Sequence, residues 1–380
     1  MKRIADQQAH AGLAMGDHDD RARADFAFSL RNRVTSTWMP GARRIFDRRA
    51  ADAFAARHGR RPQSPADIRA AMDADPWYRF YLSARRASQE TIWAAVIPPA
   101  ERLGRVAMPQ APLGSLRLDP AVRAPAYVGA IDIHCMPGGY LADRGEGDTG
   151  AGAVYDRGVY LYMSGLMGGL NDAVGQLAVR FLKERLPDFA PRRILDMGCG
   201  VGHATLPWAE AFPEAEVVGI DVGAALLRHA HVRAESLGVA AHFVQADAER
   251  TPFPEGHFDL VTSSIMLHET SARGLPAILA ESRRLLAPGG VMLHVDQPRF
   301  EADDPWATFL QENETHYNNE PFWRRYRNLD LEAEARAAGF GRVELATLAA
   351  DVVRQSQNNA ADDPRARARG FLALLAFRDD

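Results

Sequence analysis

Three glycines follow a carboxylate on alternate positions of the chain, and this group consists of Asp196, Gly198, Gly200 and Gly202. Glycine has no side chain, so the backbone can approach a ligand closely and can adopt positive φ values at which a side chain would clash. An apolar run precedes the group, a helical pattern follows over 203–212, and a second apolar run ends at Asp221. This order predicts a nucleotide-like ligand at the carboxyl edge of a parallel sheet, where Asp221 can accept from two ribose hydroxyls.

The spacing of these glycines differs from that of a dinucleotide-binding loop. The dinucleotide pattern, G-x-G-x-x-G, requires a glycine where this chain has His203. The carboxylate of Asp196 would repel a pyrophosphate, but it suits a ligand that carries an ammonium group and a sulfonium. The loop therefore favours a cationic nucleoside over a dinucleotide.

Further motifs follow the loop in order, namely 245–248 after a third predicted strand, 258–261 as a fourth, and 285–290 before a fifth. Over roughly 180–300 the chain resembles the class I S-adenosylmethionine-dependent methyltransferases, in particular their small-molecule, ubiquinone/menaquinone-type branch. The resemblance implies S-adenosylmethionine as cofactor and an α/β, Rossmann-like, doubly wound sheet of seven strands. The cofactor-binding residues that it implies are Asp196, Gly198, Cys199, Gly200, Gly202, Asp221, Val222, Asp247 and Ala248.

In the resembled family the segment before the first strand commonly covers the cofactor. Tyr155 and Tyr160 lie in that segment here, so we expect them to contact the ligand. A glycine-rich stretch precedes them, and it is either a lid over the site or a plain connector.

The acceptor of the methyl group should enter beside the carboxyl ends of the fourth and fifth strands. His268 and Glu269 follow the fourth strand, and Gln297 follows the fifth. Histidine titrates in a useful range, so we predict that His268 is a general base or orients the acceptor, with Glu269 as its neighbour. The alternative is that both residues cap a helix or lie on the surface.

A polar and aromatic run over 309–326 follows the fifth strand, where this family inserts substrate-recognition elements. Glu312, His316 and Tyr317 are its predicted substrate-binding residues, together with Gln297 and His268. The run would suit a polar acceptor such as an amine or an amino acid. The alternative is an amphipathic helix with a solvated face.

The residues directly after the fourth strand disfavour several classes of acceptor. Base amino-methyltransferases carry an Asp/Asn-Pro-Pro-aromatic tetrapeptide there, whereas this chain has 263–269, Ser-Ser-Ile-Met-Leu-His-Glu. Neither Cys135 nor Cys199 follows a proline, which argues against cytosine C5 chemistry, and two cysteines are too few for an arsenite acceptor. A small-molecule substrate remains the prediction.

Composition places the 380-residue chain among ordinary globular proteins, with 47% hydrophobic and 25% charged residues. Two cysteines offer no disulfide framework or zinc cluster, so no metal site is predicted and the cytoplasm is the expected location. No apolar stretch reaches the length of a membrane span, and the N-terminus lacks the apolar core of a signal peptide. A homodimer is possible.

Charge is divided unevenly, because residues 1–130 hold 21 Lys and Arg against 13 Asp and Glu while the whole chain is −4. A basic segment could dock nucleic acid or protein for methylation, but these arginines are dispersed, so nucleic acid is not the favoured partner. A further alternative is a non-catalytic regulator that binds the cofactor.

Three regions are predicted: a helical domain over 1–125, a linker, lid and pre-strand helix over 126–185, and a methyltransferase domain over 186–380. A proline-rich linker is expected at 98–126, a short strand at 128–133 and a long helix at 154–185. The insert 349–370 separates the last two strands, and its role is open. The strands predicted for the sheet are 194–197, 216–220, 241–245, 258–262, 290–295, 342–346 and 371–377.

Overall fold

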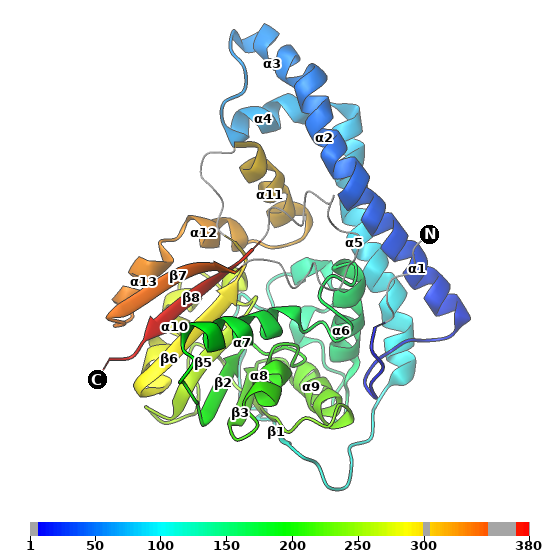
Figure 1. Ribbon diagram of the computed structural model, residues 1–380. Helices are drawn as coiled ribbons and strands as arrows, with labels where there is room; N and C mark the ends of the chain where they lie inside the picture. Colours follow the sequence, from blue (N-terminus) through cyan, green and yellow to red (C-terminus); the bar gives the residue numbers. More distant parts are fainter. Residues whose placement is uncertain (1–6, 299–304, 349–369, 380) are drawn as a thin grey trace.

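The computed structural model describes residues 7–298, 305–348 and 370–379, and it shows a twisted sheet below an arm of long helices (Figure 1). The predicted insert 349–370 lies outside the described residues except for its last position. The strands are β1 Ser115–Arg117, β2 Arg193–Met197, β3 Glu216–Asp221, β4 His242–Gln245, β5 Phe258–Ser264, β6 Leu286–Asp296, β7 Arg342–Leu348 and β8 Phe371–Phe377.

Helices occur before, between and after these strands. The helices of the N-terminal half are α1 His18–Arg33, α2 Met39–Ile45, α3 Ala51–His58, α4 Pro65–Met72, α5 Pro76–Leu103, α6 Gly150–Tyr162 and α7 Ala173–Arg185. Those of the C-terminal half are α8 Thr205–Ala211, α9 Ala224–Ser236, α10 Gly274–Leu285, α11 Pro305–Tyr317, α12 Trp323–Asn328 and α13 Leu331–Ala337. No helix in the described part of the chain combines the length and the apolar character needed to span a bilayer.

The sheet has the order β1-β4-β3-β2-β5-β6-β8-β7, and every pair is parallel except those that involve β8. This is the doubly wound α/β class that was predicted, with an antiparallel pair at its end. Alternate residues of one strand face opposite layers: Ile194 packs with α7, and Leu195 packs with α10 and α13. The two layers bury both faces of the parallel strands.

The sheet has eight strands, one more than predicted. The additional strand, β1, pairs with β4 and comes from the stretch expected to be a linker, inside the region 1–125 that was predicted to be helical. Three residues carry too little periodicity to be recognised as a strand. Gly114 allows the chain to approach β4, because a Cβ at this position would overlap the carbonyl oxygen of Ala241.

Two other expectations for local structure were wrong. The short strand predicted at 128–133 is absent, since that stretch forms turns and leads into a 3₁₀ turn at Ile133–Cys135. The long helix predicted at 154–185 is two helices, α6 and α7, separated by a loop with Gly165 and Gly168 at positive φ. The apolar pattern continues through that loop, and for this reason the break is hidden in the sequence.

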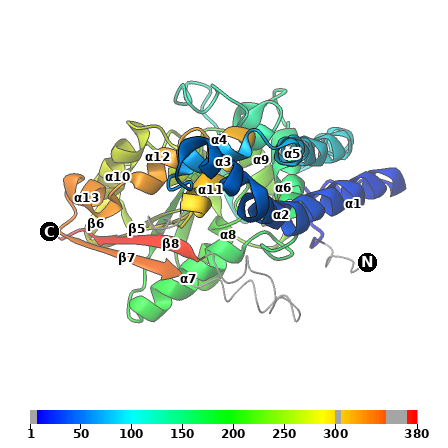
Figure 2. The same cartoon turned by 90° about the horizontal axis from the view of Figure 1, so that it is seen from above.

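The N-terminal helices form a helical arm above the carboxyl edge of the sheet (Figures 1 and 2). A continuous helical run from His18 to His58 packs antiparallel to α5, with wider π-turns at Val34–Trp38 and Phe46–Ala50. α11 is far away in the sequence, yet Trp306 and Phe309 complete the apolar core of this arm. The arm and the C-terminal half therefore share one buried cluster.

Candidate active site

A cavity of about 450 Å³ lies at the carboxyl ends of β2, β3, β4 and β5. Its floor comes from the loops that follow these strands, and its roof includes Arg31 of α1, Arg85 and Trp93 of α5 and Tyr155 of α6. The predicted lid also lines the cavity, through Tyr127, Val128, Ile133, His134 and Tyr140. Residues within 127–140 thus form part of the cavity wall, and the interpretation of the glycine-rich stretch as a lid stays a prediction.

The glycine loop takes the backbone shape that its composition predicts. Gly198, Gly200 and Gly202 all have positive φ, at 63°, 53° and 77°. The Gly200 N–H donates to Oδ2 of Asp221 at 3.0 Å, and the Gly223 N–H donates to Oδ1 at 2.8 Å. Asp221 therefore holds the loop while its carboxylate lines the cavity. Burial raises the pKa of Asp221, and the backbone N–H donors partly offset this effect.

Asp196 is the most unusual acid of the cavity. It is 1% exposed, and its Oδ2 accepts from the Thr205 hydroxyl at 2.6 Å. Its Oδ1 is buried and has no hydrogen-bond partner among the described residues. Burial raises the pKa of Asp196 to about 7. A buried acceptor that faces a cavity without a donor fits the ammonium group of the implied cofactor.

The remaining predicted cofactor residues divide into two groups. Those that line the cavity are Gly198, Cys199, Gly200, Val222, Asp247, Ala248 and Tyr155. Gly202 is not among the cavity-lining residues and faces Phe243 and Ala230, so it shapes the loop. Tyr160 also lies off the cavity, buried in an apolar cluster with Trp93. The two tyrosines are five positions apart on α6, which places them on different faces of the helix.

His268 and Asp296 form a buried pair at the acceptor side. His268 follows β5, Asp296 ends β6, and His268 Nδ1 lies 2.6 Å from Asp296 Oδ1. Burial alone would lower the pKa of His268, but the charges of Asp296, Glu269 and Glu320 outweigh it and raise the pKa to about 9. Nε2 of His268 lies 3.8 Å from Glu269 and 3.7 Å from Glu320.

A second imidazole, that of His134, lies between the same two glutamates in the wall of the cavity. His134 Nε2 lies 2.9 Å from Glu269 Oε1, and His134 Nδ1 lies 3.3 Å from Glu320 Oε1. Tyr140 also donates its hydroxyl to Glu269, at 3.1 Å. Burial opposes the charged form of His134, but the two carboxylates raise its pKa well above the ordinary value. The backbone of His134 has φ +56°, a conformation uncommon outside glycine.

The predicted substrate run contributes Glu320 and Trp323 to the cavity, in place of the residues expected. Glu312 forms ion pairs with Arg69 and Arg324, Tyr317 packs against the core of the helical arm, and His316 is exposed. These three residues are absent from the cavity lining, whereas Glu320 and Gln297 line it. Helix α11 packs against α4 and α5, and its apolar residues Trp306 and Phe309 complete the core of the arm.

Sequence reasoning assigned no role to His134, Asp296 or Glu320. Asp296 had a usable signal, because it ends a strand beside Gln297, and Glu320 lies within the polar run. His134 had none, because its strained backbone conformation and its two glutamates become visible only in the folded chain.

The fold and the loop define a class of protein. A Rossmann-like sheet, a D-x-G-x-G-x-G loop and acids after the second and third strands of the doubly wound core are those of the class I S-adenosylmethionine-dependent methyltransferases. Residues 194–290 match the family model described as a methyltransferase domain. The chain carries a class I methyltransferase domain, and S-adenosylmethionine is the cofactor of this family.

The chain aligns with only part of the length of each individual relative. A demethylmenaquinone methyltransferase from Thermus thermophilus is 39% identical over 29% of this chain and 49% of its own. An uncharacterized methyltransferase from Synechocystis is 36% identical over 39% of this chain and 66% of its own. A phosphoethanolamine N-methyltransferase from Haemonchus contortus, solved with S-adenosyl-L-methionine, is 18% identical, with a TM-score of 0.46 over 59% of this chain and 57% of its own. The chain thus spans about half the length of the first relative.

Proposed function

We propose that the protein transfers the methyl group of S-adenosylmethionine to a small polar molecule that loses a proton on methylation. The pair of His268 and Asp296 at the cavity wall carries this proposal. The matching family and the relative that acts on demethylmenaquinone support methyl transfer to a small molecule. The cavity itself is shared by the cofactor residues and by His268, so both ligands can meet there.

The bound cofactor would supply an electrophilic methyl group, and the protein supplies alignment and a place for the proton. In the neutral state of His268, Nε2 can accept a proton from an O–H, N–H or acidic C–H group. Asp296 holds the other ring nitrogen, so the ring is fixed in orientation. The carboxylates of Asp296, Glu269 and Glu320 then stabilise the imidazolium that forms.

A macromolecular acceptor is less well supported by the charges of the helical arm. Eight arginines of this region form ion pairs with nearby carboxylates, and they are Arg23, Arg43, Arg49, Arg60, Arg61, Arg69, Arg86 and Arg102. A paired guanidinium offers less to a phosphate backbone than a free one. Seven of the eight have their carboxylate partner within residues 1–130 and Arg69 pairs with Glu312, so these arginines are engaged in the fold although the region keeps its basic surplus.

The test is a screen of metabolite extracts with methyl-labelled S-adenosylmethionine, followed by kinetics of His268→Gln on the product. We expect labelled small-molecule product, a loss of turnover of about 10²- to 10⁴-fold in the variant, and cofactor affinity within a few-fold of wild type. His58→Gln, an exposed histidine on α3, is the matched control. Unchanged turnover of His268→Gln, or a product formed only on nucleic acid, would overturn the proposal.

A further inference from the structure

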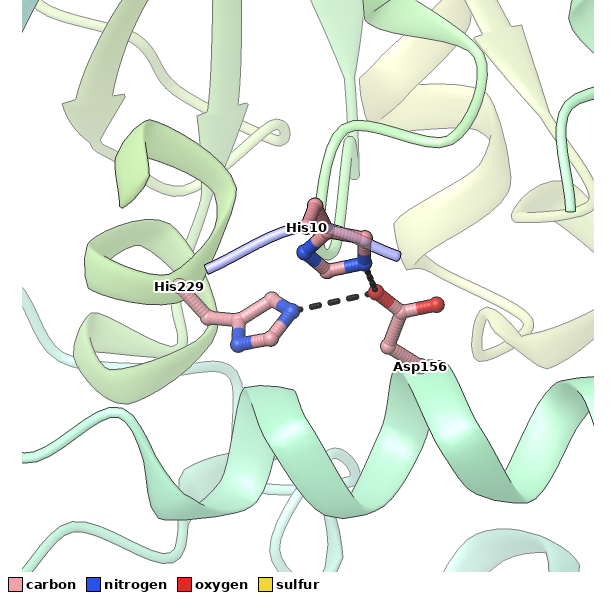
Figure 3. A group of neighbouring side chains, drawn as sticks. All are labelled: His10, Asp156 and His229. Atoms are coloured by element: carbon pink, nitrogen blue, oxygen red, sulfur yellow. Dashed lines mark hydrogen bonds and ion pairs between the residues drawn. The ribbon is translucent and has the colours of Figure 1, made fainter. Parts of the chain in front are cut away.

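Asp156 of α6 lies at the centre of a buried cluster that brings together distant parts of the chain. His10 Nε2 lies 3.0 Å and His229 Nε2 lies 3.1 Å from Asp156 Oδ2. Figure 3 shows the two rings pointing toward this carboxylate. His203, the residue directly after the glycine loop, places its Nε2 3.0 Å from the other oxygen, Oδ1. Asp156 is 1% exposed, so all of these contacts are shielded from water.

The three groups in Figure 3 have the spacing of metal ligands, but the carboxylate already has a full set of donors. Besides the three imidazoles, the side-chain amides of Gln7 and Asn171 donate to Oδ1 at 2.9 and 3.1 Å. The buried cation of Arg233 lies 3.7 Å from Oδ2, which disfavours a second cation at the same place. The cluster is therefore a satisfied anion.

The protonation states within the cluster follow from burial. Burial would raise the pKa of Asp156, but the surrounding histidines lower it well below the ordinary value. Burial lowers the pKa of both His203 and His229, although Asp156 partly opposes this shift. In its neutral form, His203 must carry its proton on Nε2 to donate to Asp156. Its Nδ1 is left as a hydrogen-bond acceptor.

His203 connects this cluster with the cofactor cavity. Its ring lines the cavity and stacks on Tyr155, with centroids 5.9 Å apart and planes at 23°. Among the described residues its Nδ1 has no hydrogen-bond partner, and neither has Oδ1 of Asp196. Two acceptors without donors therefore border the same cavity, at the two ends of the glycine loop.

We propose that His203 is a cofactor-binding residue whose Nδ1 accepts a hydrogen bond from the ammonium group of S-adenosylmethionine, alongside Asp196. Asp156 is the positioning residue that sets the tautomer and the orientation of the ring. The segment that holds Gln7 and His10 completes the donor set of Asp156, so the N-terminus contributes to the cofactor site from outside the Rossmann-like domain. This inference rests on the proposed function only for the identity of the ligand.

The test measures binding by calorimetry, with S-adenosylmethionine and with 5′-methylthioadenosine, which keeps the nucleoside but lacks the ammonium group. We expect His203→Ala to raise the Kd for S-adenosylmethionine about tenfold and to leave the Kd for methylthioadenosine unchanged. Asp156→Asn should produce the same selective loss, since it releases the Nε2–H. His18→Gln, exposed at the start of α1, should bind both ligands like the wild type.

Nitrogen-15 NMR of the histidine rings gives a readout that simple destabilisation would leave unchanged. Wild-type His203 should show the Nε2–H tautomer, its Nδ1 resonance should shift on addition of S-adenosylmethionine, and the tautomer preference should be lost in Asp156→Asn. The proposal would be overturned if His203→Ala weakened the binding of both ligands equally, or if the Nδ1 resonance did not shift. Stoichiometric metal in the purified protein would overturn it as well. Because no acceptor is needed, a protein that binds the cofactor but methylates nothing refutes the proposed function alone.

Discussion

Replacement of Asp196 by Asn should strengthen the ligand-free fold and weaken cofactor binding. The buried carboxyl has its pKa raised from 3.8 to about 7. A raised pKa of an acid destabilises the folded state once the pH exceeds the unfolded value, and the effect is complete above the folded value. Three pKa units correspond to about 4 kcal/mol. Asp196→Asn should therefore raise the free energy of unfolding by up to about 4 kcal/mol at pH 8 and leave it unchanged below pH 4.

The same substitution should weaken the binding of the cofactor. Asn can still accept from the Thr205 hydroxyl, but its amide N–H groups would then face the ammonium that we place beside Oδ1. Loss of a charge-assisted hydrogen bond of about 2 kcal/mol raises the Kd roughly thirtyfold. In the wild type, binding near pH 7 should also release about half a proton, because the cation ionises a carboxyl that is half protonated.

Urea unfolding at pH 4 and pH 8 measures the first effect. Calorimetry in buffers of different ionisation enthalpy measures the Kd and the proton release. Asp188→Asn, which removes an exposed carboxylate, is the matched control. Equal stability at both pH values, together with unchanged affinity and no proton release, would refute the assignment of Asp196 as the ammonium acceptor.

Three further changes test the site and the packing around it. Asp296→Asn removes the main charge that raises the pKa of His268, so the pH limb of methyl transfer that we expect near 9 should move to lower pH in rate profiles. Gly158→Ala places a Cβ in steric overlap with a ring carbon of Trp93, so it should destabilise the protein by about 1–3 kcal/mol in urea unfolding, and an unchanged stability would refute this contact of α5 with α6. Phe309→Ala should lower the free energy of unfolding by about 3–5 kcal/mol, because this fully buried ring joins α11 to the helical arm, and a smaller loss would show that the arm repacks without it.

The local pattern around residues 194–290 was sufficient to predict the fold class and the cofactor loop. Glycines at 198 and 200 must take positive φ wherever that loop forms, and Asp221 must end a strand for the loop to close on it. These properties depend on residues that are neighbours in the sequence, and the periodicity of a sequence predicts such local structure well. The short edge strand at 115–117 escaped prediction because it has no periodic signal of its own, and the break between α6 and α7 escaped it because apolar residues continue through the loop.

The acceptor side depended on contacts between residues far apart in the sequence. His268 was visible as a histidine after a strand, but only the folded chain shows that Asp296 and Glu320 surround it and raise its pKa to about 9. In the same way, the sequence shows His203 only as a missing glycine, and the role that we propose for it follows from its contact with Asp156, which also binds His10 in the folded chain. By itself the sequence determined the kind of cofactor, because backbone shape and strand ends are local. The tertiary structure decided the charge and orientation of the reacting groups, because burial and ion pairs arise only from long-range packing.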